Sequence, residues 1–536
     1  MRERAGTLLV ALLAAAAAGA AGACGERPDA WEQSRVVTGP IPMKDRIAYV
    51  DGARDAVVVV DAGAGGPRVD HYTVGHRPIF AAPTPDGQKL LVVTRGREAL
   101  YEGEIDEAPG LYVLAVAAPE APPIRYELES PFDRIAVAES GARAVAYFSA
   151  AGPDAEGLFW NPNELAVIDL ASPPAPENPV FRTIRSFSSA PTGVVLAPEM
   201  GVPGAPAERA APRTFAFVFA PNTLTILDAS NPGRREVSIR LATAGQATVS
   251  PEEIVFAPQA GAAYLRARGA RDVLSIQLSY QAPAADSPND NDYRPTLAEL
   301  GAGGTPADIA VYDDVGGTRR VVAATPGTRE VTLIDTTNGG FVSVPTPDPI
   351  DRILLLPDDA PRVAVLASLS TRAARGHLLG LDRIGDDLAP INLETVGLAE
   401  PTFDVVPVPG HEQVMVVHDD ARTVLGMLDV RNATVAPLEG AGRLDAYDFA
   451  GGGAYLVGAT RGVPRVGVVD LANLHPTDVR LDDDPAYVFA LASGGIYVDH
   501  GDPFGRATLI PQAGAGRDQA VVLSGFLVAG LFDERF

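Results

Sequence analysis

The chain has 536 residues, 46% of them hydrophobic and 21% charged, so it carries enough apolar side chains for an extensive core. Its formal charge of −25 argues against nucleic acid as a partner, because phosphate binding needs a Lys- and Arg-rich surface, and against a folded domain that rests on anionic lipid. The single cysteine, Cys24, excludes a disulfide-stapled fold and any structural zinc site built on several thiolates.

Residues 1–23 have the layout of a secretory signal peptide. A charged start with Arg2 and Arg4 is followed by an apolar run from Thr7 to Ala18 and then by small residues. These are the three regions of a cleaved leader. The alanine-rich run ends in small residues, which favours a leader over a permanent transmembrane helix. We therefore expect the protein to be exported.

Cys24 directly follows Ala21-Gly22-Ala23. This arrangement resembles the lipobox of bacterial lipoproteins, which implies that Cys24 becomes the lipidated first residue, although that family usually has Leu at the position of Ala21. The same three residues also suit ordinary signal-peptide cleavage, which would leave Cys24 unmodified. We favour lipidation, and with it a location in the periplasm or at the cell surface as an outer-membrane-anchored lipoprotein.

The segment after Cys24 is predicted to be a polar tether, residues 25–33 (GERPDAWEQ), that holds a domain away from a membrane. Cleavage after residue 23 removes Arg2, Glu3 and Arg4, so the formal charge changes from −25 to −26. The mature protein is thus expected to meet the membrane only through its N-terminal lipid.

Internal repetition dominates the rest of the chain. Seven times a short apolar strand ends in Asp and a turn follows; these residues are Asp61, Asp169, Asp228, Asp335, Asp382, Asp429 and Asp470. Three further apolar segments fill the gaps without the Asp, near Val116, Leu278 and Pro511. The ten positions advance by a mean of 50 residues between 61 and 511. A period of this size predicts a repeat architecture.

Each unit contains four short strands joined by Gly, Pro and Asp turns. Two apolar strands precede the Asp-ended strand, as in residues 79–96 and 308–325, and a fourth follows it, as in residues 342–347. Short Val- and Ile-rich strands, with no helical period of comparable strength outside the leader, predict an all-β chain. Four antiparallel strands at this spacing predict the blades of a β-propeller, with the Asp-ended strand third in each blade.

The clearest copy of the unit is residues 75–96 (GHRPIFAAPTPDGQKLLVVTRG). It resembles the YVTN and WD-type propeller repeats, and the resemblance covers roughly residues 44–511, although the Gly-His and Trp-Asp pairs of true WD repeats are absent. The resemblance implies a fold and no particular activity. An array of β-sandwiches is the alternative, which the spacing disfavours because such units are too short for independent sandwiches.

The predicted organisation has three parts: a signal peptide over 1–23, a lipidated Cys with tether and closing strand over 24–43, and a propeller over 44–536. Ten units exceed the usual four to eight blades, so one large ring, fewer blades or two bodies are all open. The Pro- and Asp-rich stretch near 281–297 is either a seam between bodies or a long loop inside one blade. Residues 34–39 are predicted to complete the last blade and close the ring, which would remove exposed sheet edges.

Familiar catalytic motifs are absent from the sequence, including the G-x-S-x-G elbow, the phosphate-binding P-loop and the H-E-x-x-H zinc pair. The repeated Asp residues are too regular for an active site, and we expect them to accept hydrogen bonds from backbone amides in the turn that follows. His418 and His500 end the second strands of their units, with carboxylates beside them. They are interpreted as polar loop residues, with a metal or substrate site as the alternative.

An Asp- and Asn-rich segment offers oxygen ligands for a hard cation. Its candidate ligands are Asp286, Asn289, Asp290 and Asp292. Calcium takes six to eight oxygens, and clustered Asp and Asn can provide several. The EF-hand spacing and its distal Glu are missing, so a solvated acidic loop is the competing interpretation. No other cofactor is predicted.

Two long insertions follow second strands in neighbouring units, at residues 97–110 and 149–163. Loops of the same kind share one face of a propeller, so the two should be neighbours in space. They carry Tyr101, Phe159 and Trp160, and aromatic side chains on surface loops are suited to anchor a partner. The alternative is that these rings only hold the loops against their own blades.

The function that we favour is a binding or scaffold module at the cell envelope for a protein or carbohydrate partner. The competing hypothesis is an exported enzyme on the same fold, similar to lactonase or lyase propellers, with a metal or substrate in the channel. The absence of a convincing His and Glu constellation favours binding, and the fold alone does not separate the two.

Overall fold

The computed structural model describes most of the chain outside its two ends. The described residues are 37–63, 65–99, 106–149, 161–183, 190–242, 248–283, 290–314, 316–356, 363–371, 373–381, 392–418, 423–439 and 444–528. Cys24, the leader and the tether lie outside them.

The described chain folds into ten four-stranded antiparallel sheets, each made of four strands that are consecutive in sequence. The first five are β1 (Val37–Met43), β2 (Arg46–Asp51), β3 (Ala56–Asp61), β4 (Arg68–Thr73); β5 (Pro78–Pro83), β6 (Lys89–Thr94), β7 (Gly110–Ala115), β8 (Ile124–Glu127); β9 (Arg134–Val137), β10 (Arg143–Tyr147), β11 (Leu165–Asp169), β12 (Phe181–Thr183); β13 (Gly193–Leu196), β14 (Phe215–Ala220), β15 (Thr223–Asp228), β16 (Val237–Arg240); and β17 (Ser250–Ala257), β18 (Ala262–Arg268), β19 (Val273–Tyr280), β20 (Tyr293–Leu300).

The other five sheets follow the same plan. They are β21 (Asp308–Asp313), β22 (Arg319–Thr325), β23 (Glu330–Asp335), β24 (Phe341–Pro345); β25 (Arg352–Leu355), β26 (Val363–Ala367), β27 (Arg375–Gly380), β28 (Leu393–Gly397); β29 (Thr402–Pro407), β30 (Gln413–His418), β31 (Thr423–Asp429), β32 (Thr434–Glu439); β33 (Ala446–Ala450), β34 (Tyr455–Ala459), β35 (Arg465–Asp470), β36 (His475–Arg480); and β37 (Tyr487–Ala490), β38 (Ile496–Asp499), β39 (Arg506–Ile510), β40 (Val521–Ser524).

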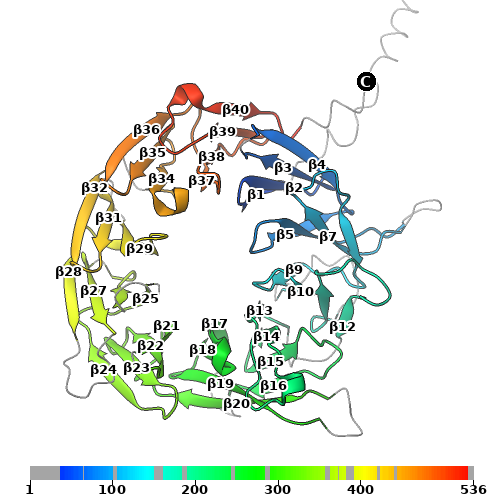
Figure 1. The fold of residues 1–536 in the computed structure, drawn as a ribbon, viewed down its shortest axis with the longest axis vertical. Coiled ribbons are helices and arrows are strands. Elements are labelled where there is room, and N and C mark those ends of the chain that lie inside the picture. Colours follow the sequence, from blue (N-terminus) through cyan, green and yellow to red (C-terminus); the bar gives the residue numbers. More distant parts are fainter. Residues whose placement is uncertain are drawn as a thin grey trace, which may run out of the picture.

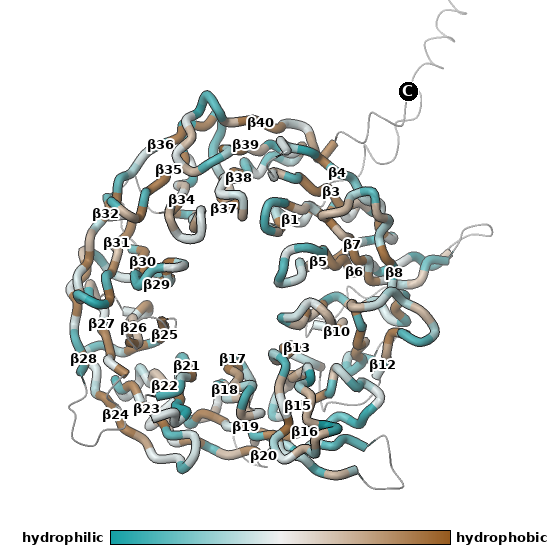
Figure 2. The backbone as a smooth tube through the Cα atoms, viewed as in Figure 1, coloured by the Kyte–Doolittle hydropathy of each residue, from teal (hydrophilic) through white to brown (hydrophobic). Residues whose placement is uncertain are grey.

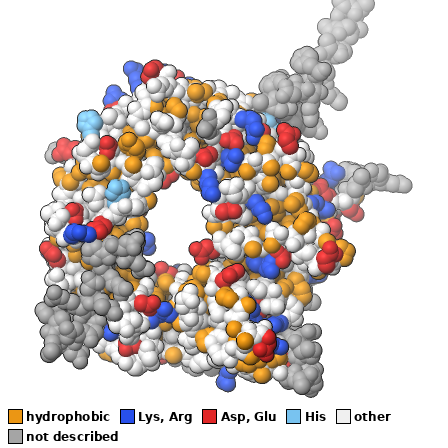
Figure 3. All heavy atoms as spheres, viewed as in Figure 1, with side chains coloured by type: hydrophobic (Ala, Val, Ile, Leu, Met, Phe, Trp, Pro, Cys, Tyr) orange, Lys and Arg blue, Asp and Glu red, His pale blue; other side chains and the backbone are white. Residues whose placement is uncertain are grey.

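The sheets are the blades of one ring around an open channel (Figures 1 and 3). The first strand of each blade lies beside the channel and the fourth lies at the rim (Figure 1). This confirms the predicted all-β propeller and settles the number of blades at ten in a single ring. The described helices are four short 3-10 turns: η2 (Ala207–Arg209), η3 (Pro258–Ala260), η4 (Gly451–Gly453) and η5 (Arg517–Gln519). Within the described ranges, no helix has the length and apolarity that a membrane crossing requires.

The apolar core lies between blades, because the middle strands are covered on both faces by neighbouring blades. In β3 the four valines 57–60 are all buried, whereas the outer strand β36 is exposed at five of its six positions. Strands that are buried on both faces read as continuous apolar runs and not as alternating ones. Figure 2 shows this difference between the apolar middle strands and the more polar rim.

The Asp-ended strands are the third strands of their blades, as predicted, at six of the seven positions; Asp382 lies outside the described residues. The three segments without the Asp are also third strands: β7, β19 and β39. Residues 281–292 connect β19 to β20, which pair directly along one blade. The candidate seam is therefore a connection within the fifth blade.

The predicted closing strand at 34–39 is wrong. β1 begins at Val37 and pairs with β2 of its own blade, from Val37 opposite Asp51 to Met43 opposite Arg46. The tenth blade is completed by its own outer strand, β40. Neither blade contributes a strand to the other, so the first and tenth blades meet through side chains.

The junction between these two blades is an apolar cluster with a polar centre. Tyr49, Tyr497 and Phe526 are buried there. The Tyr49 hydroxyl donates a hydrogen bond to the carboxylate of Asp499 and lies 2.8 Å from the Tyr497 hydroxyl. Burial raises the pKa of Asp499, and burial also raises the pKa of Tyr497. The polar groups that are withdrawn from water here satisfy one another.

Candidate functional site

The two faces of the ring differ in the loops that they carry. Because every blade is antiparallel, the connections between second and third strands and the connections between blades lie on one face, which we name the loop face. The turns from first to second and from third to fourth strands lie on the opposite turn face.

The two insertions singled out in the sequence both belong to the loop face. Residues 95–109 join β6 to β7, and residues 148–164 join β10 to β11 in the next blade. The structure therefore places them on the same face of consecutive blades. Their aromatic residues Tyr101, Phe159 and Trp160 lie outside the described residues. What the structure describes is the base of each loop, where it leaves its blade.

The base of the first insertion is held by an antiparallel bridge between Arg97 and Glu107, with both backbone hydrogen bonds at 2.8 Å. The Glu107 carboxylate accepts hydrogen bonds from the backbone amide of His76, at 3.1 Å, and from the Tyr112 hydroxyl, at 3.3 Å. Burial, together with this carboxylate, raises the pKa of Tyr112. The loop therefore begins as a short extension of the β6–β7 hairpin that is tied to the preceding connection.

Gly96 permits this arrangement. Its φ of +73° suits glycine, and a Cβ there would lie 2.1 Å from the carbonyl oxygen of Glu107. No side chain fits between backbones at that distance. The close approach of the two loop ends therefore depends on this glycine.

The base of the second insertion is held by two buried carboxylates, one at each end. Asp133 is 7% exposed and accepts hydrogen bonds from the amide and hydroxyl of Ser149, at 2.6 and 2.7 Å. Glu164 is 2% exposed and binds Arg182 through two hydrogen bonds, at 2.6 and 3.1 Å, while Ser130 donates to it at 2.7 Å. A paired and hydrogen-bonded buried carboxylate fixes its neighbours, because breaking the pair would leave a charge unsatisfied. Both ends of this loop are therefore firmly placed.

Asp133 has equivalents in two other blades. In each case an Asp directly before the innermost strand accepts amides from the loop between the second and third strands. Asp351 binds the amides of Leu369 and Ser370, at 2.6 and 2.8 Å, and Asp445 binds the amide of Arg461 at 2.7 Å. Sequence reasoning missed this device, although its signal is repeated as PFDRI (131–135) and PIDRI (349–353).

The Asp residues that end the third strands lie on the turn face and stabilise the turns that follow them. All six that the structure describes accept a hydrogen bond from the amide two residues later, as at Gly63 and Ala171, both at 2.9 Å. Two of them also pair with an Arg of the second strand: Arg46 lies 3.0 Å from Asp61, and Arg143 pairs with Asp169. The predicted structural role is confirmed.

The candidate calcium ligands are not brought together in the described part of the chain. Asp286 and Asn289 lie outside it, and Asp290 is half-buried. Asp292 is fully buried, and its oxygens accept from Arg209, Arg213 and Arg234, at 3.2, 2.8 and 2.7 Å. Burial raises the pKa of Asp292, but the hydrogen bond and charge of Arg213 outweigh it, and the net pKa is lowered. Three guanidinium groups occupy the place that a cation would take.

The two equivalent histidines each bind the connection that precedes their blade. His418 is buried, with Nδ1 3.3 Å from the carbonyl oxygen of Pro401. His500 has Nδ1 3.0 Å from the carbonyl of Asp484 and Nε2 2.8 Å from the hydroxyl of Thr508. These contacts join strands to connections within one blade. No group of three His, Cys, Asp or Glu in the described ranges is placed to hold a metal ion.

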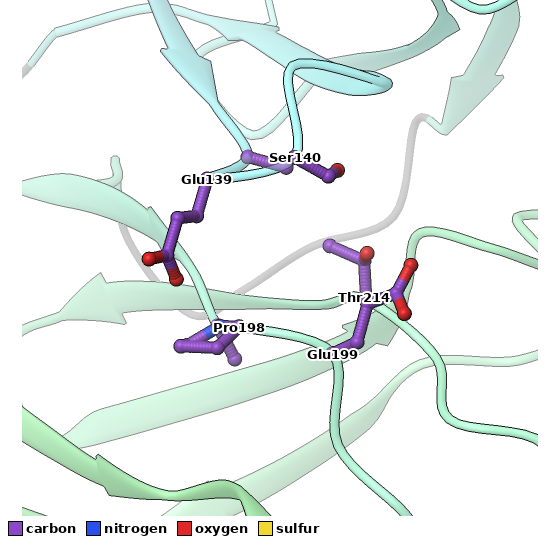
Figure 4. Close-up of a pocket in the computed structure, with 7 residues that line it drawn as sticks. Glu139, Ser140, Pro198, Glu199 and Thr214 are labelled. Atoms are coloured by element: carbon purple, nitrogen blue, oxygen red, sulfur yellow. The ribbon is translucent and has the colours of Figure 1, made fainter. Parts of the chain in front are cut away.

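A cavity of about 280 Å³ lies on the turn face between the third and fourth blades. It is lined by Ala138, Glu139, Ser140, Ala197, Pro198, Glu199 and Thr214. Figure 4 shows Glu139 and Ser140 from the β9–β10 turn on one side, and Pro198, Glu199 and Thr214 on the other. The cavity is on the face opposite to the two insertions and does not belong to the same site.

Comparison with known proteins adds no function. No family model and no curated protein matches the sequence. Among solved structures, the dihydro-haem d1 dehydrogenase NirN in complex with DHE shares 12% identity over 85% of this chain and 77% of its own, with a TM-score of 0.39. A eukaryotic initiation factor shares 12% identity over 76% of this chain and 88% of its own, with a TM-score of 0.41. Similarity at this level does not extend to activity or ligands.

Proposed function

We propose that the chain is an exported, lipid-anchored β-propeller that binds a protein or carbohydrate partner at the cell envelope through its loop face. The observation that carries the proposal is the position of the two long insertions, which rise from consecutive blades on that face. Two loops whose ends are firmly placed on neighbouring blades can meet one partner at a low cost in ordering entropy.

The partner class follows from the side chains that the loops carry. Tyr101 and Trp160 provide amphipathic rings and Phe159 an apolar one, and aromatic rings contribute much of the binding energy at protein interfaces. The formal charge of −26 after cleavage disfavours nucleic acid, whose phosphates would be repelled. The location follows from the leader and Cys24, with the lipid as the contact with the membrane.

The anchor is tested by replacing the single cysteine. Native protein should fractionate with membranes, and Cys24→Ala should be released as soluble protein or retained as precursor. The reason is that the lipid is the only strong membrane contact that the sequence offers. Identical fractionation of the two proteins would refute the anchor.

The binding surface is tested at Trp160. Trp160→Ala should weaken capture of the partner by about 2 kcal/mol, which is roughly 30-fold in Kd, with the melting temperature unchanged. Immobilised protein would be probed with a glycan array and with solubilised envelope proteins. The matched control is Trp31→Ala, because Trp31 is the only other tryptophan and lies before the ring. A loss of stability with unchanged capture would show that Trp160 only holds its own loop.

A further inference from the structure

The cavity on the turn face between the third and fourth blades has a buried floor and an exposed rim. At the floor, Ala138 and Ala197 are each 1% exposed, and Thr214 is 3% exposed. At the rim, Glu139 in the β9–β10 turn and Glu199 in the connection from β13 to β14 are exposed. Figure 4 shows the two glutamates on opposite sides of the cavity. A carboxylate on each side therefore flanks an apolar floor that carries one buried hydroxyl.

Backbone hydrogen bonds hold both walls of this cavity in place. In the β9–β10 turn, the amide of Ala138 donates to the carbonyl of Arg143 at 2.9 Å, and the amide of Gly141 donates to the carbonyl of Ala138 at 2.8 Å. On the other wall, the amide of Ala197 donates to the carbonyl of Phe215 at 2.8 Å. Walls that are fixed before a ligand arrives lower the cost of ordering on binding.

The hydroxyl of Thr214 is available to a ligand. The backbone of this residue is engaged, because its amide donates to the hydroxyl of Ser230 at 3.0 Å and its carbonyl accepts from the amide of Ala229 at 2.9 Å. The side-chain hydroxyl has no hydrogen-bond partner among the described residues. The Thr214 side chain points toward Ser140 on the opposite wall (Figure 4). Buried polar groups are nearly always hydrogen-bonded, so this hydroxyl indicates a place for a polar group of a ligand.

The two carboxylates at the rim attract positive charge. No Lys, Arg or His in the described ranges forms an ion pair with Glu139 or Glu199. Two carboxylates that the protein does not neutralise favour a cation between them, and the formal charge of −25 adds a long-range attraction. Because the floor is apolar, the attracted cation needs an aliphatic body as well as its charge.

We propose that this cavity binds a short aliphatic diammonium ion, the protonated form of a linear diamine. One ammonium group binds the carboxylate of Glu139, and the other binds the carboxylate of Glu199 and donates to the hydroxyl of Thr214. The methylene chain covers the methyl groups of Ala138 and Ala197. An ammonium group offers three donors and no acceptor, which suits these oxygens, and a volume of about 280 Å³ suits a small ligand. The site lies away from the loop face and depends on neither the anchor nor the partner of the proposed function.

Other small ligands match the lining less well. Anions are repelled by the two carboxylates. Calcium takes six to eight oxygen ligands, whereas the side chains of the lining offer two carboxylates on opposite sides and the hydroxyls of Ser140 and Thr214. A wholly apolar ligand leaves the Thr214 hydroxyl unsatisfied. A diammonium ion uses the carboxylates, the hydroxyl and the apolar floor together.

The test is calorimetric titration of the full-length native protein with linear diamines of three to six carbons, and with butylamine and butanediol as probes that carry one charge and none. We expect saturable binding of at least one diamine, with butylamine weaker by about fivefold or more and butanediol without measurable binding, because each ammonium group meets its own carboxylate. Equal affinity for butylamine and the best diamine overturns the site with two carboxylates. Absence of saturable binding of every diamine up to about 10 mM overturns the proposal as a whole.

Substitutions then locate the binding. Glu139→Gln and Glu199→Gln should each weaken diamine binding about fivefold, and Thr214→Val about threefold, while Tm of the two glutamate variants stays unchanged because both side chains are exposed. The control is Glu120→Gln, since Glu120 is an exposed glutamate of the β7–β8 turn on the same face, and its loss changes the net charge equally. An equal effect of Glu120→Gln shows attraction to the acidic surface alone and overturns the site. Unchanged affinity of Glu139→Gln or Glu199→Gln overturns it as well.

Discussion

Asp292→Asn should destabilise the ring more than any other single change in the segment that precedes β20. The Asp292 carboxylate is fully buried, and it holds Arg213 and Arg234 at 2.8 and 2.7 Å. The Arg213 side chain is itself 9% exposed, and its other carboxylate partner among the described residues is Asp228, at 2.8 Å. Loss of the charge leaves Arg213 and Arg234 to share the buried carboxylate of Asp228 and removes the ion pair of Arg209. Breaking such a pair costs about 3–5 kcal/mol, and because the Asn oxygen still accepts one hydrogen bond we expect about 3 kcal/mol.

The assay is thermal unfolding, compared with Asp290→Asn. Both substitutions remove one negative charge, but Asp290 is only half-buried, so its loss should stay within about 0.5 kcal/mol. For cooperative unfolding of about 490 residues, 3 kcal/mol lowers Tm by about 3 °C. The lowered pKa of Asp292 also means that its contribution is present above the unfolded pKa, near 4, and is lost as the pH falls through the folded value.

Calcium dependence would refute this reasoning. If Asp292 were a metal ligand, chelator would lower Tm of the native protein, and Asp290→Asn and Asp292→Asn would lower it alike. The ion-pair account expects no effect of chelator and a clear difference between the two variants at neutral pH.

The remaining predictions concern the loop face and one buried histidine. Gly96→Ala should open the base of the first insertion and weaken partner capture at least as much as Trp160→Ala, because its Cβ would lie 2.1 Å from the Glu107 carbonyl oxygen. The control is Gly462→Ala, since Gly462 has a similar φ of +76° and nothing within 4 Å of the added Cβ. An equal effect of the two substitutions would contradict the steric argument. Burial lowers the pKa of His377, which lies 3.1 Å from Asp348 and 3.0 Å from Thr395, with Arg375 on the same carboxylate. Unfolded protein therefore binds the proton first, so stability should rise with pH between the lowered folded pKa and about 6.5. Unfolding midpoints of His377→Gln should lose that slope, and an unchanged slope would place its origin elsewhere.

Most of the fold could be predicted because the signals are local. An apolar strand that ends in Asp and enters a turn needs only a few neighbouring residues to form, and seven such segments, with three that lack the Asp, recur at a regular step. The Asp61 side chain bonds the amide of Gly63, two residues later, so its role can be read from the sequence alone. The same count predicted ten units but left one ring, fewer blades and two bodies open, and the structure shows ten blades in one ring.

The ring closure and the loop anchors could not be predicted because they depend on distant partners. Tyr49 meets Tyr497 and Asp499 across more than 440 residues, and nothing in either segment indicates the other. Residues 34–39 were expected to add a strand to the last blade, because such a strand would cover an exposed sheet edge. Instead, β1 pairs with β2 of its own blade. Asp292 seemed a cation ligand because its arginine partners are 58 to 83 residues away.

Because the first and tenth blades meet through side chains and exchange no strand, the ring does not depend on which blade begins the chain. Val37 packs against the junction cluster that contains Leu527, so the first and last described residues leave the ring at the same junction and on the same face. A linker from 528 to 37 would create a continuous chain, and new ends in a turn such as Gly339-Gly340 would leave nine blades with four consecutive strands and build the sixth blade from both ends of the chain. Circular permutation should therefore preserve this ring, since chain ends in exposed turns cut no hydrogen-bonded ladder. Each permutant would also move the anchoring end to a different blade, which would give control over how the loop face is presented.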